Sequence, residues 1–148
     1  PVTSIKPLQD QFMGFILKAA EQMPEADFAY APTTGVRTFG QMVGHVANAN
    51  FMFCATVKGE KSPATVNYET LAGNKAALVE GLKAAMAYCG TAWEAGAKKH
   101  HDTVDLFGTK GDVTWALAFN IAHNAEHYGN LVTYLRTKGM VPPSSQRN

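Results

Sequence analysis

Residues 112–138 read DVTWALAFNIAHNAEHYGNLVTYLRTK and carry the clearest helical pattern in the chain. Asp112 or Thr114 can cap the start of this helix, and Gly139 follows its end. Apolar residues and two histidines recur at steps of three and four, as along one face of an α-helix. This stripe comprises Ala116, Phe119, His123, His127, Leu131 and Tyr134. We therefore predict a long helix whose inward face carries two histidines.

Three more segments have the helical period, and no segment shows a convincing strand alternation. The first covers residues 5–23 and is stopped by Pro24. The second covers residues 38–58, with a capping box at its start and a glycine after its end. The third begins near Tyr68 and ends before Gly96, and residues 96–111 are expected to form a loop. The sequence thus predicts one all-α domain over residues 1–148, most simply a four-helix bundle.

Composition excludes several functional classes. With 148 residues and 46% hydrophobic content, the chain can bury one substantial core. The net charge of +1 does not favour nucleic acid or an anionic membrane as a partner. No apolar stretch approaches the ~20 residues of a membrane span. Localisation stays open: cytoplasmic by default, exported if a signal peptide preceded Pro1.

Three of the five histidines lie inside predicted helices. His123 and His127 are four residues apart, so their imidazoles can converge on one ion. His45 lies on a stripe of the second helix next to its main apolar face and can supply a third nitrogen. We predict that these three histidines bind one divalent transition metal, with open positions suited to catalysis. His100 and His101 lie in the predicted loop and are not expected to be ligands.

Two alternatives compete with this interpretation. A lone histidine on an apolar face is usually a hydrogen-bonded core residue, although three at compatible positions favour a metal. Residues 123–127, HNAEH, also match the inverted zincin motif H-x-x-E-H, in which Glu126 would be the general base of a hydrolase. That motif needs an acidic ligand farther downstream, and the chain has no Asp or Glu after His127. A metal-dependent hydrolase is therefore the weaker alternative.

Two segments resemble the DinB-like family. Residues 39–47, FGQMVGHVA, are similar to its second helix, and residues 123–136, HNAEHYGNLVTYLR, to its last helix. The tail at residues 138–143, KGMVPP, also fits, and the helix layout matches over nearly the whole chain. The resemblance implies a four-helix bundle with down-up-up-down connectivity, often found as a homodimer.

The resemblance also implies a function. Nickel or zinc would be held by His45, His123 and His127, and some relatives transfer low-molecular-weight thiols such as bacillithiol or mycothiol. We therefore expect a metal-dependent enzyme of that kind acting on a small-molecule substrate. The alternative is a non-catalytic module for metal binding or dimeric interaction. Glu126 either orients a ligand imidazole from behind or is an ordinary exposed glutamate.

Whether Cys54 and Cys89 can form a disulfide depends on the topology. They are either two buried thiols or a disulfide. The link between the second and third predicted helices holds about ten residues and can span at most ~33–36 Å. That is enough to run back along a helix of ~30 Å. Helices two and three can then be parallel, which brings Cys54 and Cys89 to nearly the same level. A tight turn between the helices would keep the two cysteines far apart.

Overall fold

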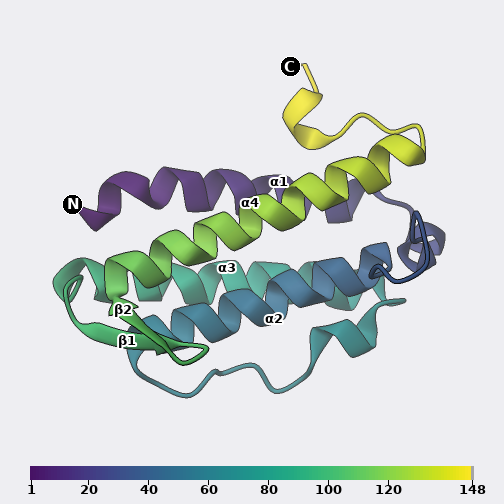
Figure 1. Cartoon of the computed structure of the whole chain (residues 1–148). Coiled ribbons are helices and arrows are strands. Elements are labelled where there is room, and N and C mark those ends of the chain that lie inside the picture. Colours follow the sequence, from purple (N-terminus) through teal and green to yellow (C-terminus); the bar gives the residue numbers. More distant parts are fainter. Residues whose placement is uncertain (148) are drawn as a thin grey trace.

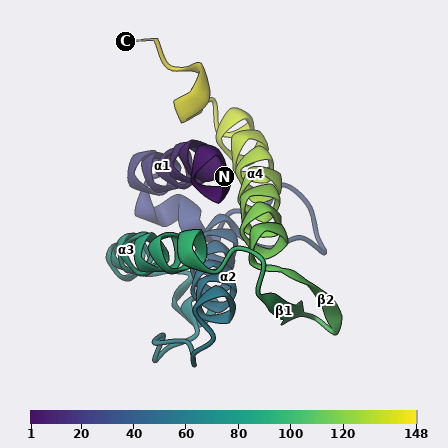
Figure 2. The same cartoon turned by 90° about the vertical axis from the view of Figure 1, so that its left-hand side faces the viewer.

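The computed structural model describes residues 1–147, in which four long helices pack along one another (Figure 1). Viewed from one end, they surround a common core (Figure 2). The predicted all-α four-helix bundle is therefore confirmed. No helix in the described residues is long and apolar enough to cross a membrane. The helices are α1 (Lys6–Gln22), α2 (Phe39–Lys58), α3 (Lys75–Lys98) and α4 (Val113–Thr137), with 3₁₀ turns η1 (Val2–Ile5), η2 (Glu25–Ala29), η3 (Tyr68–Leu71) and η4 (Pro143–Ser145).

Local capping signals fix the ends of α2 and α4 as the sequence predicts. The Thr38 hydroxyl accepts a hydrogen bond from the Gln41 N–H at 3.1 Å, and the Gln41 side chain accepts one from the Thr38 N–H at 2.9 Å. Gly59 follows α2 with a φ of 70°, a left-handed conformation that glycine adopts at low cost. The cap of α4 is Asp112, whose carboxylate accepts from the Trp115 N–H at 2.8 Å.

The predicted start of the third helix was wrong. Residues Tyr68–Leu71 form the separate turn η3, and α3 begins only at Lys75. Asn74 caps α3 by accepting a hydrogen bond from the Ala77 N–H at 3.0 Å. A side-chain cap favours a new helix start over continuation of the preceding turn. The link between α2 and α3 therefore covers residues 59–74 and is longer than predicted.

The structure also contains two short strands, although the sequence predicted none. Beyond Gly96, α3 continues to Lys98, and residues 103–112 form an antiparallel hairpin of β1 (Thr103–Leu106) and β2 (Thr109–Asp112). Each strand has four residues, too few for an alternating pattern to stand out. Leu106 is the single fully buried strand residue and anchors the hairpin to the core.

Helices α2 and α3 run parallel, as the crossover connectivity requires. The sulfur atoms of Cys54 and Cys89 are bonded, and farther along both helices Lys58 donates a hydrogen bond to Thr91 at 3.1 Å. The chain passes left to right in α1, back in α2 and α3, and left to right again in α4 (Figure 1). The corrected start of α3 places both cysteines about 21–23 Å from their helix starts, at the same level.

A layer of four buried amides lies inside the bundle between two apolar clusters. The side-chain oxygen (Oδ1) of Asn50, on α2, accepts hydrogen bonds from the side-chain amides of Gln9 at 3.1 Å, Asn120 at 3.0 Å and Asn124 at 3.2 Å. The Asn50 amide group donates to Asn124 at 2.8 Å, and Asn124 donates to Gln9 at 3.0 Å. These bonds join α1, α2 and α4 at one level, so they set the register between the helices.

We predict that Asn50→Ala lowers the free energy of unfolding by about 2–4 kcal/mol, because three buried amide donors lose their acceptor. Urea titration followed by circular dichroism measures the change. Thr56→Ala on the same helix removes only a bond to the Met52 carbonyl and is expected to lower the free energy by under about 1 kcal/mol. Equal losses in the two variants would show that the amide layer does not set the stability.

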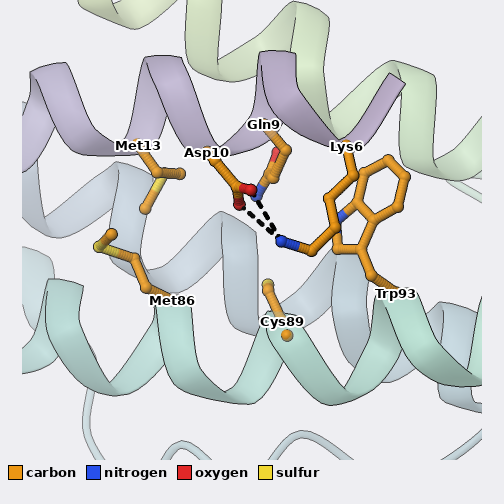
Figure 3. Close-up of a pocket in the computed structure, with 8 residues that line it drawn as sticks. Lys6, Gln9, Asp10, Met13, Met86, Cys89 and Trp93 are labelled. Carbon is orange, nitrogen blue, oxygen red and sulfur yellow. Dashed lines mark hydrogen bonds and ion pairs between the residues drawn. The ribbon is translucent and has the colours of Figure 1, made fainter. Parts of the chain in front are cut away.

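The Cys54–Cys89 disulfide is enclosed by the core. Cys54 is fully buried, and Cys89 is 2% exposed. Cys89 lies at a small hollow between α1 and α3, which is also lined by Lys6 and Asp10 of α1, an ion pair (Figure 3). The cavity volume is about 60 Å³, room for roughly two water molecules and too little for a common reducing agent. We therefore expect the folded protein to resist reduction.

The disulfide should contribute strongly to stability. For a sequence separation of 35 residues, loop-closure entropy predicts a loss of about 3–4 kcal/mol when the bond is removed. The double variant Cys54→Ala/Cys89→Ala should show this loss in urea unfolding. Reductant should reach the disulfide of the unmodified protein only once the protein unfolds. It should not change the free energy of unfolding of the double variant. The same stability in both proteins without reductant would contradict the bond.

Candidate metal centre

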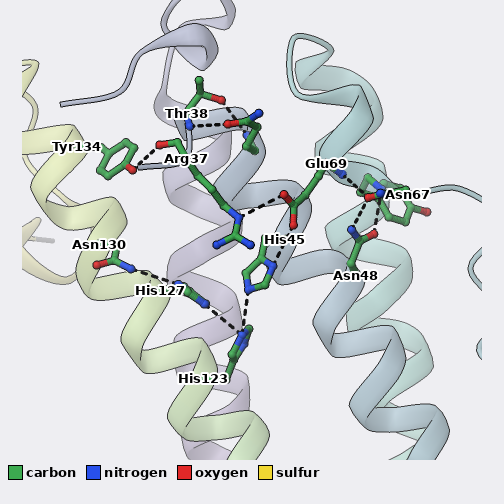
Figure 4. Close-up of polar contacts among 12 residues, drawn as sticks. Arg37, Thr38, His45, Asn48, Asn67, Glu69, His123, His127, Asn130 and Tyr134 are labelled. Carbon is green, nitrogen blue, oxygen red and sulfur yellow. Dashed lines mark hydrogen bonds and ion pairs between the residues drawn. The ribbon is translucent and has the colours of Figure 1, made fainter. Parts of the chain in front are cut away.

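Three imidazoles meet between α2 and α4 (Figure 4). His45 comes from α2, and His123 and His127 come from successive turns of α4. The Nε2 atom of His123 lies 3.1 Å from the Nε2 atoms of both His45 and His127. Within residues 1–147 no other His, Cys, Asp or Glu joins this group. The structure thus brings together the three histidines singled out from the sequence.

The geometry fits one transition-metal ion. Two nitrogens at about 2.1 Å from an ion are about 3.0–3.4 Å apart at octahedral to tetrahedral angles. The two Nε2 pairs that include His123 have this spacing, and the ligand atoms of all three histidines lie within 4.8 Å of one another. Three imidazole nitrogens without a thiolate suit zinc, nickel, copper or iron. Because only three protein ligands meet here among the described residues, an ion bound there would keep positions for other ligands.

The outer ring nitrogens of two histidines have polar partners. His45 Nδ1 lies 3.0 Å from the Glu69 carboxylate, and His127 Nδ1 lies 3.2 Å from the Asn130 side-chain amide. When Nδ1–H donates a hydrogen bond to the carboxylate, the His45 Nε2 lone pair is free to bind a metal. His123 Nδ1 is buried without a hydrogen-bond partner among the described residues. The His123 ring instead packs edge-on against Phe53, with centroids 5.5 Å apart.

Burial keeps the inner histidines neutral. Loss of hydration, with the neighbouring His127 and His45 acting in the same direction, lowers the pKa of His123 to about 4. Burial also lowers the pKa of His127, again with His45 acting in the same direction. The imidazoles of His123 and His127 are therefore neutral near pH 7, and the neutral ring is the form that binds a metal.

Close backbone packing on α2 places Glu69 beside His45. A Cβ atom at Gly44 would lie 2.5 Å from the Tyr68 carbonyl oxygen, and one at Gly40 would lie 1.8 Å from that of Ala72. Glycine at these two positions lets η3 lie directly on the helix. Asn48 adds two hydrogen bonds to η3, to Asn67 at 2.7 Å and from the Tyr68 N–H at 2.9 Å.

Arg37 adds a positive charge at the edge of the centre. Its Nε donates to Glu69 at 3.2 Å, and its backbone carbonyl accepts from the Tyr134 hydroxyl. The Arg37 side chain is 41% exposed, so the guanidinium is held by Glu69 yet open to solvent. Arg37, Glu69 and His45 thus form one chain of charge-assisted contacts (Figure 4).

Two hollows flank the histidines. The first is polar, with a cavity volume of about 610 Å³, and its lining includes Arg37, Glu126 and His127. The second is mainly apolar, with a volume of about 310 Å³, and His45 and His123 belong to its lining. The three imidazoles therefore lie where a polar and an apolar hollow approach each other.

The structure assigns the outer hydrogen bonds to residues that the sequence did not single out. Glu126 is exposed, and among the described residues it makes no hydrogen bond to an imidazole; its charge only opposes the lowering of the His127 pKa. The partners are instead Glu69 and Asn130. Asn130 has a sequence signal, since it lies one helical turn after His127. Glu69 has none, because η3 lies in a link that the sequence merged with the next helix.

Comparisons agree with this architecture. The chain is similar in fold to a DinB-like protein from Bacillus cereus ATCC 10987, with a TM-score of 0.79 and 16% identity over 94% of this chain and 95% of that one. A DinB-like protein from Bacillus subtilis has a TM-score of 0.64 and 21% identity over the same shares. No curated protein matches the chain. The profile of the DinB superfamily matches residues 16–131, so the chain belongs to the DinB superfamily.

Proposed function

We propose that this protein is a metal-dependent transferase that activates a low-molecular-weight thiol, such as bacillithiol or mycothiol. The observation that carries the proposal is the meeting of three imidazoles at the border of two hollows of different polarity. A transferase must bind two unlike molecules side by side, and this border offers one place for each. Nickel and zinc both suit the nitrogen donors.

The chain's own residues supply binding and orientation. His45, His123 and His127 would hold the ion, and Glu69 fixes the His45 ring with its proton on Nδ1. Arg37 lines the polar hollow, where its guanidinium suits an anionic group on the thiol. When bound, the metal would lower the pKa of a thiol and so supply a thiolate near pH 7. Positioning the thiolate beside an electrophile contributes several kcal/mol to lowering the barrier.

The first test of this proposal is metal binding. His45→Ala, His123→Ala and His127→Ala should each lose bound nickel or zinc, measured by elemental analysis after dialysis, because each removes one of three nitrogen ligands. His100→Ala and His101→Ala are matched controls, since these residues lie between α3 and β1 outside the cluster. Full metal occupancy in His123→Ala and His45→Ala would refute the ligand assignment.

The second test is chemistry. Conjugation of a reactive electrophile to bacillithiol, mycothiol or glutathione should require metal and should fall to background in His127→Ala. Arg37→Gln should raise the KM for an anionic thiol more than it lowers kcat, because the guanidinium would bind the ground state and transition state alike. The Cys54→Ala/Cys89→Ala variant should keep its activity, since the nucleophile belongs to the co-substrate.

The controls separate the alternatives. Metal-free protein gives the background rate, and ester and amide substrates test the weaker hydrolase alternative. If metal binds but no thiol gives a metal-dependent rate and hydrolysis is equally silent, a non-catalytic module for metal binding or dimeric interaction replaces the enzyme.

A further inference from the structure

The tip of the β1–β2 hairpin carries a phenylalanine in a conformation that disfavours it. Phe107 and Gly108 join the strands, and both have positive φ, 56° and 82°. Two-residue turns of this kind favour Asn-Gly or Gly-Gly, since a bulky side chain in the left-handed region costs roughly 1–2 kcal/mol. Phe107 is also 72% exposed, so burial of its ring does not offset this cost. A strained and exposed aromatic residue beside a candidate site suggests a role in binding.

The hairpin holds Phe107 firmly in place. The Asp105 carboxylate accepts from the Gly108 N–H at 2.8 Å and closes the turn. Leu106 is buried in the core. Near the other end, a Cβ atom at Gly111 would lie 2.2 Å from the Trp115 ring, so the absence of a side chain lets β2 lie against the start of α4. The tip is therefore a fixed part of the surface.

Phe107 completes a cluster of three phenylalanines next to the imidazoles. Its ring centroid lies 6.1 Å from that of Phe53 on α2 and 6.3 Å from that of Phe119 on α4. The rings of Phe53 and Phe119 are 5.5 Å apart, and Phe53 also packs against His123. Phe53 and Phe107 line the apolar hollow together with Met52, His45 and His123. Two of the three phenylalanines and two of the three histidines thus line one cavity.

We infer that this hollow binds the uncharged aromatic or planar apolar group of the substrate, and that Phe107 is a specificity-determining residue for it. Calling the bound molecule a substrate rests on the proposed function. No Lys, Arg, Asp or Glu lines the hollow, so a charged group would lose hydration without a partner. The volume of about 310 Å³ is at the lower end of the range for ligand sites and suits one small ring system.

Benzyl mercaptan tests the inference, with 2-mercaptoethanol as the thiol that lacks a ring. Affinities are measured by NMR titration of the Met52 methyl signal in metal-free and zinc-loaded protein. The decisive variant is Phe107→Asn, because asparagine tolerates the left-handed turn while removing the ring. We expect benzyl mercaptan to bind about five- to twentyfold more weakly in Phe107→Asn, and 2-mercaptoethanol to bind equally well.

Two further measurements separate binding from folding. The midpoint of thermal unfolding should stay equal or rise in Phe107→Asn, since strain is relieved, whereas a purely structural ring would lower it. Phe107→Leu should keep affinity for benzyl mercaptan within about threefold, since it keeps an apolar wall. Val66→Ala, at another exposed apolar residue, should change nothing.

Unchanged affinity for benzyl mercaptan in Phe107→Asn, or an equal loss for both thiols, overturns the inference. So does a failure of benzyl mercaptan to shift the Met52 signal in the unmodified protein. The metal-free titration reports on the hollow alone. Selective weakening there supports the aromatic site even if the protein proves to bind no metal and to transfer no thiol.

Discussion

The side-chain amide of Asn50 determines how α2 lies against α4, and the candidate centre depends on that register. Its bonds to Asn120 and Asn124 fix one level of the two helices. His45 lies five residues before Asn50, and His123 and His127 each lie three residues after one of the two α4 asparagines. A slip by one turn, about 5.4 Å, would break the amide bonds and separate His45 from its partners. Apolar contacts alone would tolerate several registers between the helices. Because unpaired buried amides are costly, the polar layer selects one of them.

The same register explains why the imidazoles suit a cation. Packing between α2 and α4 removes water from His123 and His127, which keeps them neutral. Imidazole nitrogens that lie 3.1 Å apart either share a proton in a hydrogen bond or face each other with two lone pairs. An ion between the nitrogens removes the repulsion between the lone pairs. Glu69 strengthens the effect at His45, because a carboxylate at Nδ1 makes the opposite nitrogen a better donor.

Helical periodicity was enough to predict the bundle and the three histidines, because every such feature repeats within one helix or lies on its inward face. The sequence did not reveal what depends on contacts between elements. Glu69 reaches His45 only because Gly40 and Gly44 let the turn η3 lie on α2, and spacing along the chain carries no signal for this approach. The hairpin was missed for a related reason, since its short strands are stabilised by one buried leucine and by packing on α4.

The hairpin also decides what kind of molecule can approach the imidazoles. Without it, the face of α2 and α4 that carries His45 and His123 would open toward solvent on the side of Phe53. With it, that side becomes an apolar hollow, while Arg37 and Glu126 keep the opposite side polar. A charged molecule would lose least hydration on the Arg37 side, and an apolar one would gain most from burial on the Phe53 side. In the proposed transferase, two unlike molecules would therefore bind on different sides of the imidazoles, and binding would supply the orientation that a bimolecular reaction needs.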